Sequence, residues 1–404
     1  MAQPASVIVV SRGRPENLSL CLAALARQDH PNFEVIVVAD PGGLAAVRGA
    51  ALAATEVAFD EPNISKARNL GISAAAGSVI AFIDDDAYAE PTWLRQLTAP
   101  FEAGQIGLAG GFVRGRNGIT YQWRARRIDR TGFHHPEPVP DGPPVTFPAD
   151  PENPIKTEGT NMAVTRSVLN DLGGFDGAYR FYLEDADLNI RAAYAGAATA
   201  IVPWAQVVHV TAPSERRAAN RMPRSLHEIG ASLAYFLARH APDGAATGAL
   251  AEARLAERAR LLRHMVSGNC MPGDVARLLV GFDTGARDGA GRSPALGFAP
   301  SDRSFIPYRS AAAQTELSGR EFRARSLRGA AKAAASAGDQ VDLYLFSRTA
   351  LYHHTRFYAP GYWEHSGGLF GRSVRKEPLF SPYFFSTRLQ KERRRVAKLR
   401  GLPH

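Results

Sequence analysis

The stretch Val79-Ile-Ala-Phe-Ile-Asp-Asp-Asp86 is an apolar run that ends in three consecutive carboxylates. Its apolar part, Val79–Ile83, predicts a buried strand. Open α/β sheets bind their ligands beyond the carboxyl ends of the strands, and hard divalent cations prefer oxygen ligands. The stretch therefore favours a cation site at the edge of a sheet. An acidic turn before a helix that begins at Pro91 would explain the same residues.

Strand and helix patterns alternate before this stretch. Ser6–Val10 and Phe33–Ala39 are apolar, largely β-branched runs that predict buried strands. Apolar residues at helical spacing predict helices over Pro15–Gln28 and Ser65–Ala76. The alternation predicts an α/β fold in which helices flank a mostly parallel sheet.

The rest of the chain divides by composition. Periodicity fades from Val113 to Pro154, where eight prolines occur between Pro136 and Pro154, and we expect a long irregular loop there. Residues 224–281 repeat Ala, Leu and Arg at helical spacing, and Val341–Phe346 resembles a strand. The predicted units are an α/β domain over 1–215, a helical extension over 216–282, a linker over 283–304 and a basic C-terminal region of undefined role over 305–404.

Positive charge is concentrated near the C-terminal end. The net charge is +9, and residues 301–404 contain 19 Lys and Arg against 8 Asp and Glu, whereas residues 1–300 contain 29 against 31. Such a separation predicts an anionic partner for the C-terminal region. The segment Arg388–Arg400 fits an amphipathic helix on an anionic membrane surface. A solvated charged helix fits it equally well.

Composition argues against several classes of protein. Hydrophobic residues make up 45% of the chain, as in ordinary folded proteins. Cys21 and Cys270 are too few and too distant for a disulfide framework or a zinc site. The sequence has no signal-peptide pattern and no apolar run of about 20 residues, so we expect a cytoplasmic protein, peripheral on the membrane at most. No nucleic-acid-binding motif appears, and we expect no nucleic-acid partner.

Polar residues also follow the two earlier predicted strands. Ser11, Arg12 and Arg14 follow the first strand, and Asp40 follows the second. Asp40 fits either a contact to a base or ribose or an ordinary turn. The first turn contains Gly13 alone, which argues against the G-x-G-x-x-G loop of dinucleotide-binding domains.

Five features in this order resemble family 2 glycosyltransferases of the GT-A fold, over about residues 5–210. They are Ser6-Val-Ile-Val-Val-Ser-Arg-Gly-Arg-Pro15, the strand ending in Asp40, Asn63-Ile-Ser-Lys-Ala-Arg-Asn-Leu-Gly71, Ile83-Asp-Asp-Asp-Ala-Tyr-Ala-Glu-Pro91, and a final group formed by Gly159-Thr-Asn-Met162, Gly174-Phe-Asp176 and Glu184-Asp-Ala-Asp-Leu188.

The resemblance implies a role for each matching position. Nucleotide-sugar binding is implied for Ser11, Arg12, Arg14, Asp40, Lys66, Arg68, Asn69, Asp84 and Asp85. The cleft for the donor sugar and the acceptor would be formed by Gly159, Thr160, Asn161, Glu184 and Trp204. The metal, Mg²⁺ or Mn²⁺, would be bound by Asp86, Asp84 and His209, of which Asp86 is the expected direct ligand. Lys66 and Arg68 also fit a solvated helix face, and His209 and Trp204 also fit core packing.

Asp185 matches the general base of the family. An inverting transfer needs a carboxylate that takes the proton of the acceptor hydroxyl, on an element distant from the metal motif. Alternatively, Glu184, Asp185 and Asp187 only favour a helix N-terminus electrostatically.

The sequence thus predicts an inverting, metal-assisted glycosyltransferase of polysaccharide biosynthesis. The expected donor is a UDP-, GDP- or dTDP-linked sugar, and the expected acceptor is a glycan or a lipid-linked saccharide. An inactive sugar- or nucleotide-binding protein and a sugar nucleotidyltransferase remain alternatives. Presence of both Asp86 and Asp185 argues against the first, and the lack of a Gly-rich phosphate loop argues against the second.

Overall fold

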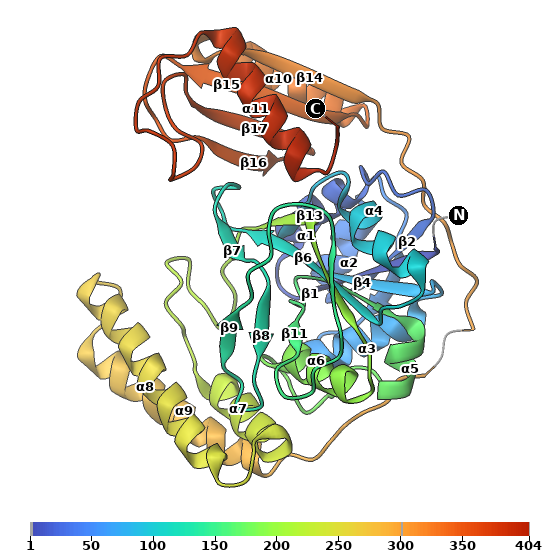
Figure 1. Ribbon diagram of the computed structural model, residues 1–404, viewed down its shortest axis with the longest axis vertical. Coiled ribbons are helices and arrows are strands. Elements are labelled where there is room, and N and C mark those ends of the chain that lie inside the picture. Colours follow the sequence, from blue (N-terminus) through green and yellow to red (C-terminus); the bar gives the residue numbers. More distant parts are fainter. Residues whose placement is uncertain (1–2, 300–301, 404) are drawn as a thin grey trace.

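A computed structural model describes residues 3–299 and 302–403. A ten-stranded sheet forms the centre of the molecule, with eight strands in the order β10-β13-β6-β12-β4-β1-β2-β3, β5 beside β13 and β7 beside β6 (Figure 1). Its strands are β1 (Ala5–Ser11), β2 (Phe33–Ala39), β3 (Thr55–Ala58), β4 (Val79–Asp84), β5 (Ala87–Ala89), β6 (Leu108–Arg114), β7 (Tyr121–Trp123), β10 (Val145–Phe147), β12 (Asn161–Thr165) and β13 (Thr199–His209).

The first four strands of this sheet in chain order are parallel. β1 lies between β2 and β4, with Ser11 opposite Ala39 and Val10 opposite Asp84. The carboxyl ends of β1, β2 and β4 therefore meet at one edge, where the polar residues of the sequence motifs follow. β12 runs antiparallel between β4 and β6.

Helices cover both faces of the sheet. The alternation along β1 sends Val7 and Val9 to one core and Ile8 to the other. The first core is covered by α1 (Pro15–Leu25), α2 (Pro41–Arg48), α4 (Trp93–Thr98) and the 3-10 helix η1 (Ala99–Ala103), and the second by α3 (Ile64–Ala74), α5 (Arg166–Leu172) and α6 (Glu184–Tyr194). The predicted α/β fold with a flanked, mostly parallel sheet is confirmed.

The expectation of an irregular loop over Val113–Pro154 is wrong in part. This segment contains β7, β10, β8 (Arg126–Ile128) and β9 (His134–Pro136). β8 also pairs with β11 (Ile155–Lys156), which gives a three-stranded sheet in the order β11-β8-β9. Strands of three residues are too short for an alternating pattern to be recognised, and Pro136 lies at the end of an edge strand, where proline is tolerated.

Three helices follow the catalytic domain: α7 (His227–His240), α8 (Ala245–Val266) and α9 (Pro272–Ala290). The predicted helical extension is therefore present, but α9 continues into the segment predicted as a linker from residue 283. The glycines that suggested a linker serve helix packing instead. A Cβ at Gly285 would lie 1.9 Å from the carbonyl oxygen of His227, so glycine allows α9 to contact the backbone of α7.

The basic C-terminal region is a folded α/β domain. Its four-stranded sheet has the order β14-β15-β17-β16. The elements are β14 (Gln314–Arg320), η2 (Glu321–Arg323), α10 (Ala324–Ser336), β15 (Gln340–Ser347), β16 (His354–Tyr358), β17 (Tyr362–Gly368) and α11 (Phe385–Leu399). The predicted strand Val341–Phe346 lies within β15. A largely extended segment joins this domain to α9 and passes along one side of the catalytic domain (Figure 1).

The amphipathic pattern of Arg388–Arg400 has a different cause from the membrane contact considered above. Leu389 and Val396 are buried in a core with Phe346. Several cations of α11 pair with carboxylates of the same domain, as Arg393 does with Glu316. The apolar face of the helix is therefore occupied by protein. In the described residues no helix is both long and apolar enough to cross a membrane.

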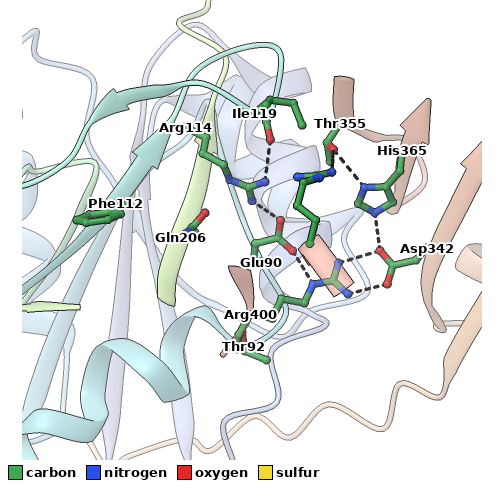
Figure 2. A network of polar contacts seen from close by, with 12 residues as sticks. Glu90, Thr92, Phe112, Arg114, Ile119, Gln206, Asp342, Thr355, His365 and Arg400 are labelled. Atoms are coloured by element: carbon green, nitrogen blue, oxygen red, sulfur yellow. Dashed lines mark hydrogen bonds and ion pairs between the residues drawn. The ribbon is translucent and has the colours of Figure 1, made fainter. Parts of the chain in front are cut away.

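A buried polar network joins the C-terminal domain to the catalytic domain (Figure 2). Arg400 donates from Nε to Glu90 at 2.8 Å and from Nη1 and Nη2 to Asp342 at 2.7 and 2.8 Å. Glu90 also pairs with Arg114, and Asp342 contacts Nε2 of His365 at 2.9 Å. Glu90 directly follows β5, so the network reaches the loop that carries the three carboxylates.

Candidate active site

Asp84, Asp86 and His209 form a cluster at the carboxyl ends of β4 and β13. One potential ligand atom of each lies within 4.8 Å of the others. His209 Nε2 is 3.2 Å from Oδ1 of Asp86, and Thr160 Oγ1 donates to Oδ2 of Asp84 at 2.5 Å. Two carboxylates and an imidazole are a suitable donor set for a divalent cation. The three residues predicted to bind metal are therefore brought together.

The middle carboxylate, Asp85, points away from this cluster. It is fully buried, accepts a hydrogen bond from Ser11 Oγ at 2.6 Å and pairs with Arg14 Nη2 at 2.5 Å. Burial raises the pKa of Asp85 to about 7, against the opposing effect of Arg14. Asp85 thus stabilises the loop after β1, whereas Asp84 and Asp86 belong to the cluster with His209.

Asp86 is stabilised as an anion. Burial alone would raise its pKa, but the charge and hydrogen bond of His209, together with Arg14, hold that pKa below the usual range. The backbone N–H of Ala212 also donates to its Oδ2 at 2.7 Å. An ionised, buried carboxylate of this kind is ready to bind a cation.

Arg68 joins the carboxylate cluster to the start of α6. Its guanidinium lies 3.5 Å from Asp84 and donates to Glu184 at 2.8 Å. The guanidinium of Arg68 can lie here because Gly159 has no side chain. A Cβ at Gly159 would lie 2.4 Å from Arg68 Nη2. The guanidinium of Arg68 thereby holds together the motif of Asp84 and the motif of Glu184, which are a hundred residues apart in the sequence.

A strained turn presents Glu184 and Asp185. Tyr182 and Leu183 have φ values of 75° and 65°, in the left-handed region that bulky residues rarely adopt. Such strain is often found at functional sites. It directs the first residues of α6 into the cavity.

Asp185 is held by polar contacts on both oxygens. Oδ2 accepts from Lys156 Nζ at 2.8 Å and from the Gly159 N–H at 3.0 Å, and Oδ1 accepts from the Ala186 N–H at 2.7 Å. Burial opposes ionisation, but Lys156 and Gly159 lower the pKa of Asp185 to about 2. The carboxylate is therefore ionised at neutral pH.

One cavity of about 600 Å³ contains both motifs. The predicted residues that line it are Ser11, Arg12, Arg14, Asp84, Asp86, Thr160, Glu184, Asp185 and His209. Asp86 and Asp185 therefore face the same space, as a metal-assisted transfer requires. Arg68, Asp85 and Gly159 lie directly behind this lining and fix it.

Other predicted site residues have structural contacts instead. Asp40 caps α2 through the Gly43 N–H at 2.9 Å. Asn69 holds the backbone of Phe175 through contacts of 2.7 and 2.9 Å.

Lys66 also lies outside the cavity lining, pairing at the surface with Glu61 at 2.9 Å. Asn161 is buried and accepts from Trp93 Nε1 at 2.7 Å.

Trp204 does not lie in the cleft, contrary to the expectation above. A Cβ at Gly401 would lie 2.9 Å from the Trp204 ring, which places this side chain against the end of the C-terminal domain. The indole sits at a bulge in β13, where the register with β6 shifts between Val202 and Val207. The sequence alone does not reveal such a shift.

One wall of the cavity was not predicted from the sequence. This wall comes from the β11-β8-β9 sheet and the turn after β11, and it includes Lys156, Glu158, Arg126 and His134. Lys156 Nζ bridges Asp185 and Glu158, and Arg126 pairs with Glu158. The only signal was the position of Lys156 and Glu158 just before the Gly159-Thr160-Asn161 motif.

Comparison with known proteins finds glycosyltransferases that are similar to this chain. The family described as Glycosyl transferase family 2 matches residues 6–183. The O-antigen biosynthesis protein RfbC of Myxococcus xanthus is 26% identical over 228 residues, which are 52% of this chain and 18% of that protein. Glycosyltransferase AglE of Haloferax volcanii is 28% identical over 183 residues, which are 42% of this chain and 55% of that protein. The chain thus spans about a fifth and about half of these two relatives.

A solved structure is similar at lower identity. The mannosyltransferase PcManGT from Pyrobaculum calidifontis, in complex with GDP-Man and Mn²⁺, aligns with 18% identity and a TM-score of 0.45 over 72% of this chain and 88% of its own. The sequence match, and the five motifs that surround one cavity, agree on the same segment. Residues 6–183 of this chain are therefore similar in sequence to family 2 of the glycosyltransferases.

Proposed function

We propose that this protein is an inverting glycosyltransferase that moves a sugar from a nucleotide-diphosphate donor to a hydroxyl group of a glycan or a lipid-linked saccharide. The observation that carries the proposal is the contact of Arg68 with both Asp84 and Glu184, at 3.5 and 2.8 Å. It holds a cation-binding carboxylate and the motif of the general base around one cavity. A protein that only binds a sugar does not need the second motif.

Asp185 is the proposed base. In the described part of the chain, its Oδ1 accepts only the Ala186 N–H, so this oxygen has a free lone pair for the acceptor hydroxyl. The pKa of about 2 makes Asp185 a weak base before reaction. The alcohol becomes strongly acidic as its oxygen bonds to the sugar carbon, and a weak base is then sufficient.

Asp84, Asp86 and His209 are the residues that would hold Mg²⁺ or Mn²⁺. Such a cation supplies charge neutralisation to the departing diphosphate. Arg14 keeps Asp85 and Asp86 in place from the opposite side, at 2.5 and 3.2 Å. One relative of this segment is named for O-antigen biosynthesis, which supports a saccharide as the acceptor class.

Two substitutions separate donor binding from transfer. UDP-, GDP- and dTDP-sugars are titrated by calorimetry with Mn²⁺, Mg²⁺ or EDTA, and transfer is assayed with the best donor. We expect Asp86→Asn to abolish metal-supported donor binding. Asp185→Asn should keep donor binding and lower the transfer rate by about 10²–10⁴-fold, the usual contribution of a general base.

Asp171→Asn is the matched control, because Asp171 is exposed and has no partner in the described residues. It should leave both measurements unchanged. Full transfer activity in Asp185→Asn would remove the assignment of the base. Absence of metal-dependent binding for every donor would remove the proposed function.

A further inference from the structure

A second, larger cavity opens beside the catalytic one. Its volume is about 1030 Å³, and it lies between the catalytic domain, α8 and β16 of the C-terminal domain. We call it the basic groove after its cationic lining residues, Arg116, Arg217, Arg221, Arg260, His264 and Arg356. Arg217, Arg221 and Arg260 also line the catalytic cavity. The two spaces are therefore continuous at these three arginines.

The charge of the basic groove is largely uncompensated. Among the described residues, no Asp or Glu side chain lines it. Arg116, Arg221 and Arg356 are exposed and have no ion-pair partner in the part of the chain that the structure describes. Arg260 is the exception, since it pairs with Glu257 at 2.6 Å. By contrast, most cations of the neighbouring helix α11 pair with carboxylates.

Several groove residues are held in place before any ligand arrives. Arg221 and Thr211 have φ values of 68° and 57°, in the left-handed region. Arg217 donates to the carbonyl oxygen of Ala212 at 2.8 Å, while its Nε is buried without a hydrogen-bond partner among the described residues. Burial, followed by the nearby charge of Arg116, lowers the pKa of Arg221. An anion would relieve this repulsion.

The floor of the groove is apolar. Tyr88 and Phe357 lie with ring centroids 5.7 Å apart, and Val208 and Val210 lie beside them. Phe357 belongs to the C-terminal domain, and Tyr88 lies on β5, next to the three carboxylates. A floor of this kind suits the apolar faces of sugar rings, while the arginines above it suit carboxylates or phosphates, which the guanidinium fork binds with two hydrogen bonds.

We propose that the basic groove binds the acceptor, and that the acceptor is a saccharide chain with repeated anionic groups, either carboxylates or phosphodiesters. This inference rests on the proposed function, because the groove opens into the cavity that contains Asp185. The cations are contributed by two domains and by α8, which fits an extended ligand. The C-terminal domain then has a definite role, since β16 completes the acceptor site.

A close backbone contact between the two domains positions β16 at the groove. The Thr355 N–H donates to the carbonyl oxygen of Asn117 at 2.9 Å. A Cβ at Gly118 would lie 2.1 Å from the carbonyl oxygen of Thr355, so the turn that carries Arg116 fits closely against β16. Arg116 and Arg356, which are the sequence neighbours of these contacting residues, are thereby kept together in the lining of one groove.

The test uses the full chain and a double substitution, Arg116→Glu with Arg356→Glu. The probes are oligogalacturonate, its methyl ester, and a glycerol-phosphate oligomer, measured by calorimetry. We expect at least one anionic oligomer to bind, the neutral ester to bind far more weakly, and added salt to weaken the binding. The double substitution should weaken binding of the anionic oligomer by about tenfold or more, since two favourable ion contacts become repulsive.

The matched control is Arg325→Glu with Lys332→Glu. Both residues are exposed on α10 of the same domain, and neither lies in the groove, so this variant should bind like the parent chain. Circular dichroism checks folding, and Arg116→Gln with Arg356→Gln provides a milder pair if the first one unfolds. Equal binding of oligogalacturonate and its ester, or no effect of either pair, would overturn the proposal.

Two further probes address other anionic partners. Phosphatidylglycerol vesicles and a single-stranded oligonucleotide are tested in the same assay. Binding of either one through Arg116 and Arg356, with no binding of the saccharides, would overturn the proposal in favour of a membrane or nucleic-acid surface. Donor binding with metal is measured separately on the same chain. If the chain binds the anionic oligomer but binds no donor with metal, the proposed function is wrong and the groove remains a glycan-binding site.

Discussion

Arg68 can occupy the space between Asp84 and Glu184 because Gly159 has no side chain. A Cβ at this position would lie 2.4 Å from Arg68 Nη2 and 2.8 Å from Nη1. We therefore expect Gly159→Ala to displace the guanidinium and to lower the transfer rate by about tenfold or more, since small displacements of catalytic groups are costly. The transfer assay with saturating donor measures this.

Gly142→Ala is the control for this change, because a Cβ at Gly142 has no atom within 4 Å. It should leave the transfer rate unchanged. If Gly159→Ala is as active as Gly142→Ala, the position of Arg68 is not important for the reaction.

Lys156 controls the protonation of Asp185. Burial favours the protonated carboxyl group, and Lys156 overcomes this to lower the pKa to about 2. In Lys156→Met the burial is opposed by weaker effects, such as those of the Gly159 contact and of Arg68, so the pKa of Asp185 should rise. Asp185, the proposed base, is then protonated at higher pH, and the acidic limb of the pH profile of kcat/KM should move to higher pH.

Lys332→Met, on the exposed face of α10, is the control variant, and the acidic limb of its pH profile should stay where it is in the parent chain. An unshifted acidic limb in Lys156→Met would show that a different group limits activity at low pH. The ion pair of Lys156 and Asp185 also affects the stability of the fold. The stabilisation by ionised Asp185 is fully present above the ordinary pKa of an aspartate and is lost as the pH falls through about 2.

At the scale of residues, the sequence predicted that Asp86 and Asp185 share a cleft, and it missed the wall that Lys156 and its neighbours form. Asp86 and Asp185 lie in motifs whose residue types have a direct chemical meaning. Lys156 follows no such pattern, and its importance comes from β11, a strand of two residues. Trp204 was expected in the cleft because of its chemistry, yet a bulge in β13 directs it elsewhere.

At the scale of elements, the contact between α7 and α9 depends on small residues. A Cβ at Gly289 would lie 2.0 Å from the carbonyl oxygen of Ala231. We expect Gly289→Ala to lower the free energy of unfolding by about 1–3 kcal/mol through overpacking. Denaturant unfolding followed by far-UV circular dichroism measures it.

Gly281 lies on the same helix, and a Cβ at this position would have no neighbouring atom within 4 Å. Gly281→Ala should therefore be neutral or stabilise by about 0.5–1 kcal/mol, because alanine favours a helix over glycine. Equal effects of the two substitutions would mean that α9 does not need close contact with α7.

The long elements of the catalytic domain were predictable because their patterns are local. β1, β2 and β4 are continuous apolar runs, and their bounds differ from the predicted ones by a residue or less. The strands between Val113 and Pro154 were not predictable, since pairing with distant partners, and not an apolar run, makes them strands. The end of α9 was missed because its glycines were taken for flexibility.

At the scale of the whole molecule, Arg400 fixes the C-terminal domain to the catalytic domain. Arg400→Met would leave Glu90 and Asp342 buried with a missing partner, which typically costs about 3–5 kcal/mol. We expect the C-terminal domain to undock or unfold before the catalytic domain. Urea unfolding should change from one transition to two, and protease cleavage near Ser304 should become faster.

Lys398→Met, at the end of α11 and two positions before Arg400, is the control, because Lys398 is exposed and unpaired in the described residues. It should unfold as the parent chain does. A single, unshifted transition in Arg400→Met would show that other contacts hold the two domains together.

This organisation was not visible in the sequence, where the last hundred residues showed mainly positive charge. The reason is that the partners of these charges are distant: Glu90 is 310 positions from Arg400. Charge counts along the chain do not record such pairs. The excess of cations was therefore read as a surface for a partner, although much of it stabilises the domain itself.

Contacts outside the segment that crosses from α9 to β14 hold the C-terminal domain in place. Arg27 donates to the carbonyl oxygens of Ala335 and Asp339 at 2.7 and 2.9 Å, independently of the Arg400 network. A chain severed at Ser304 should consequently stay assembled, and the two fragments, produced as separate polypeptides, should recombine into an active pair.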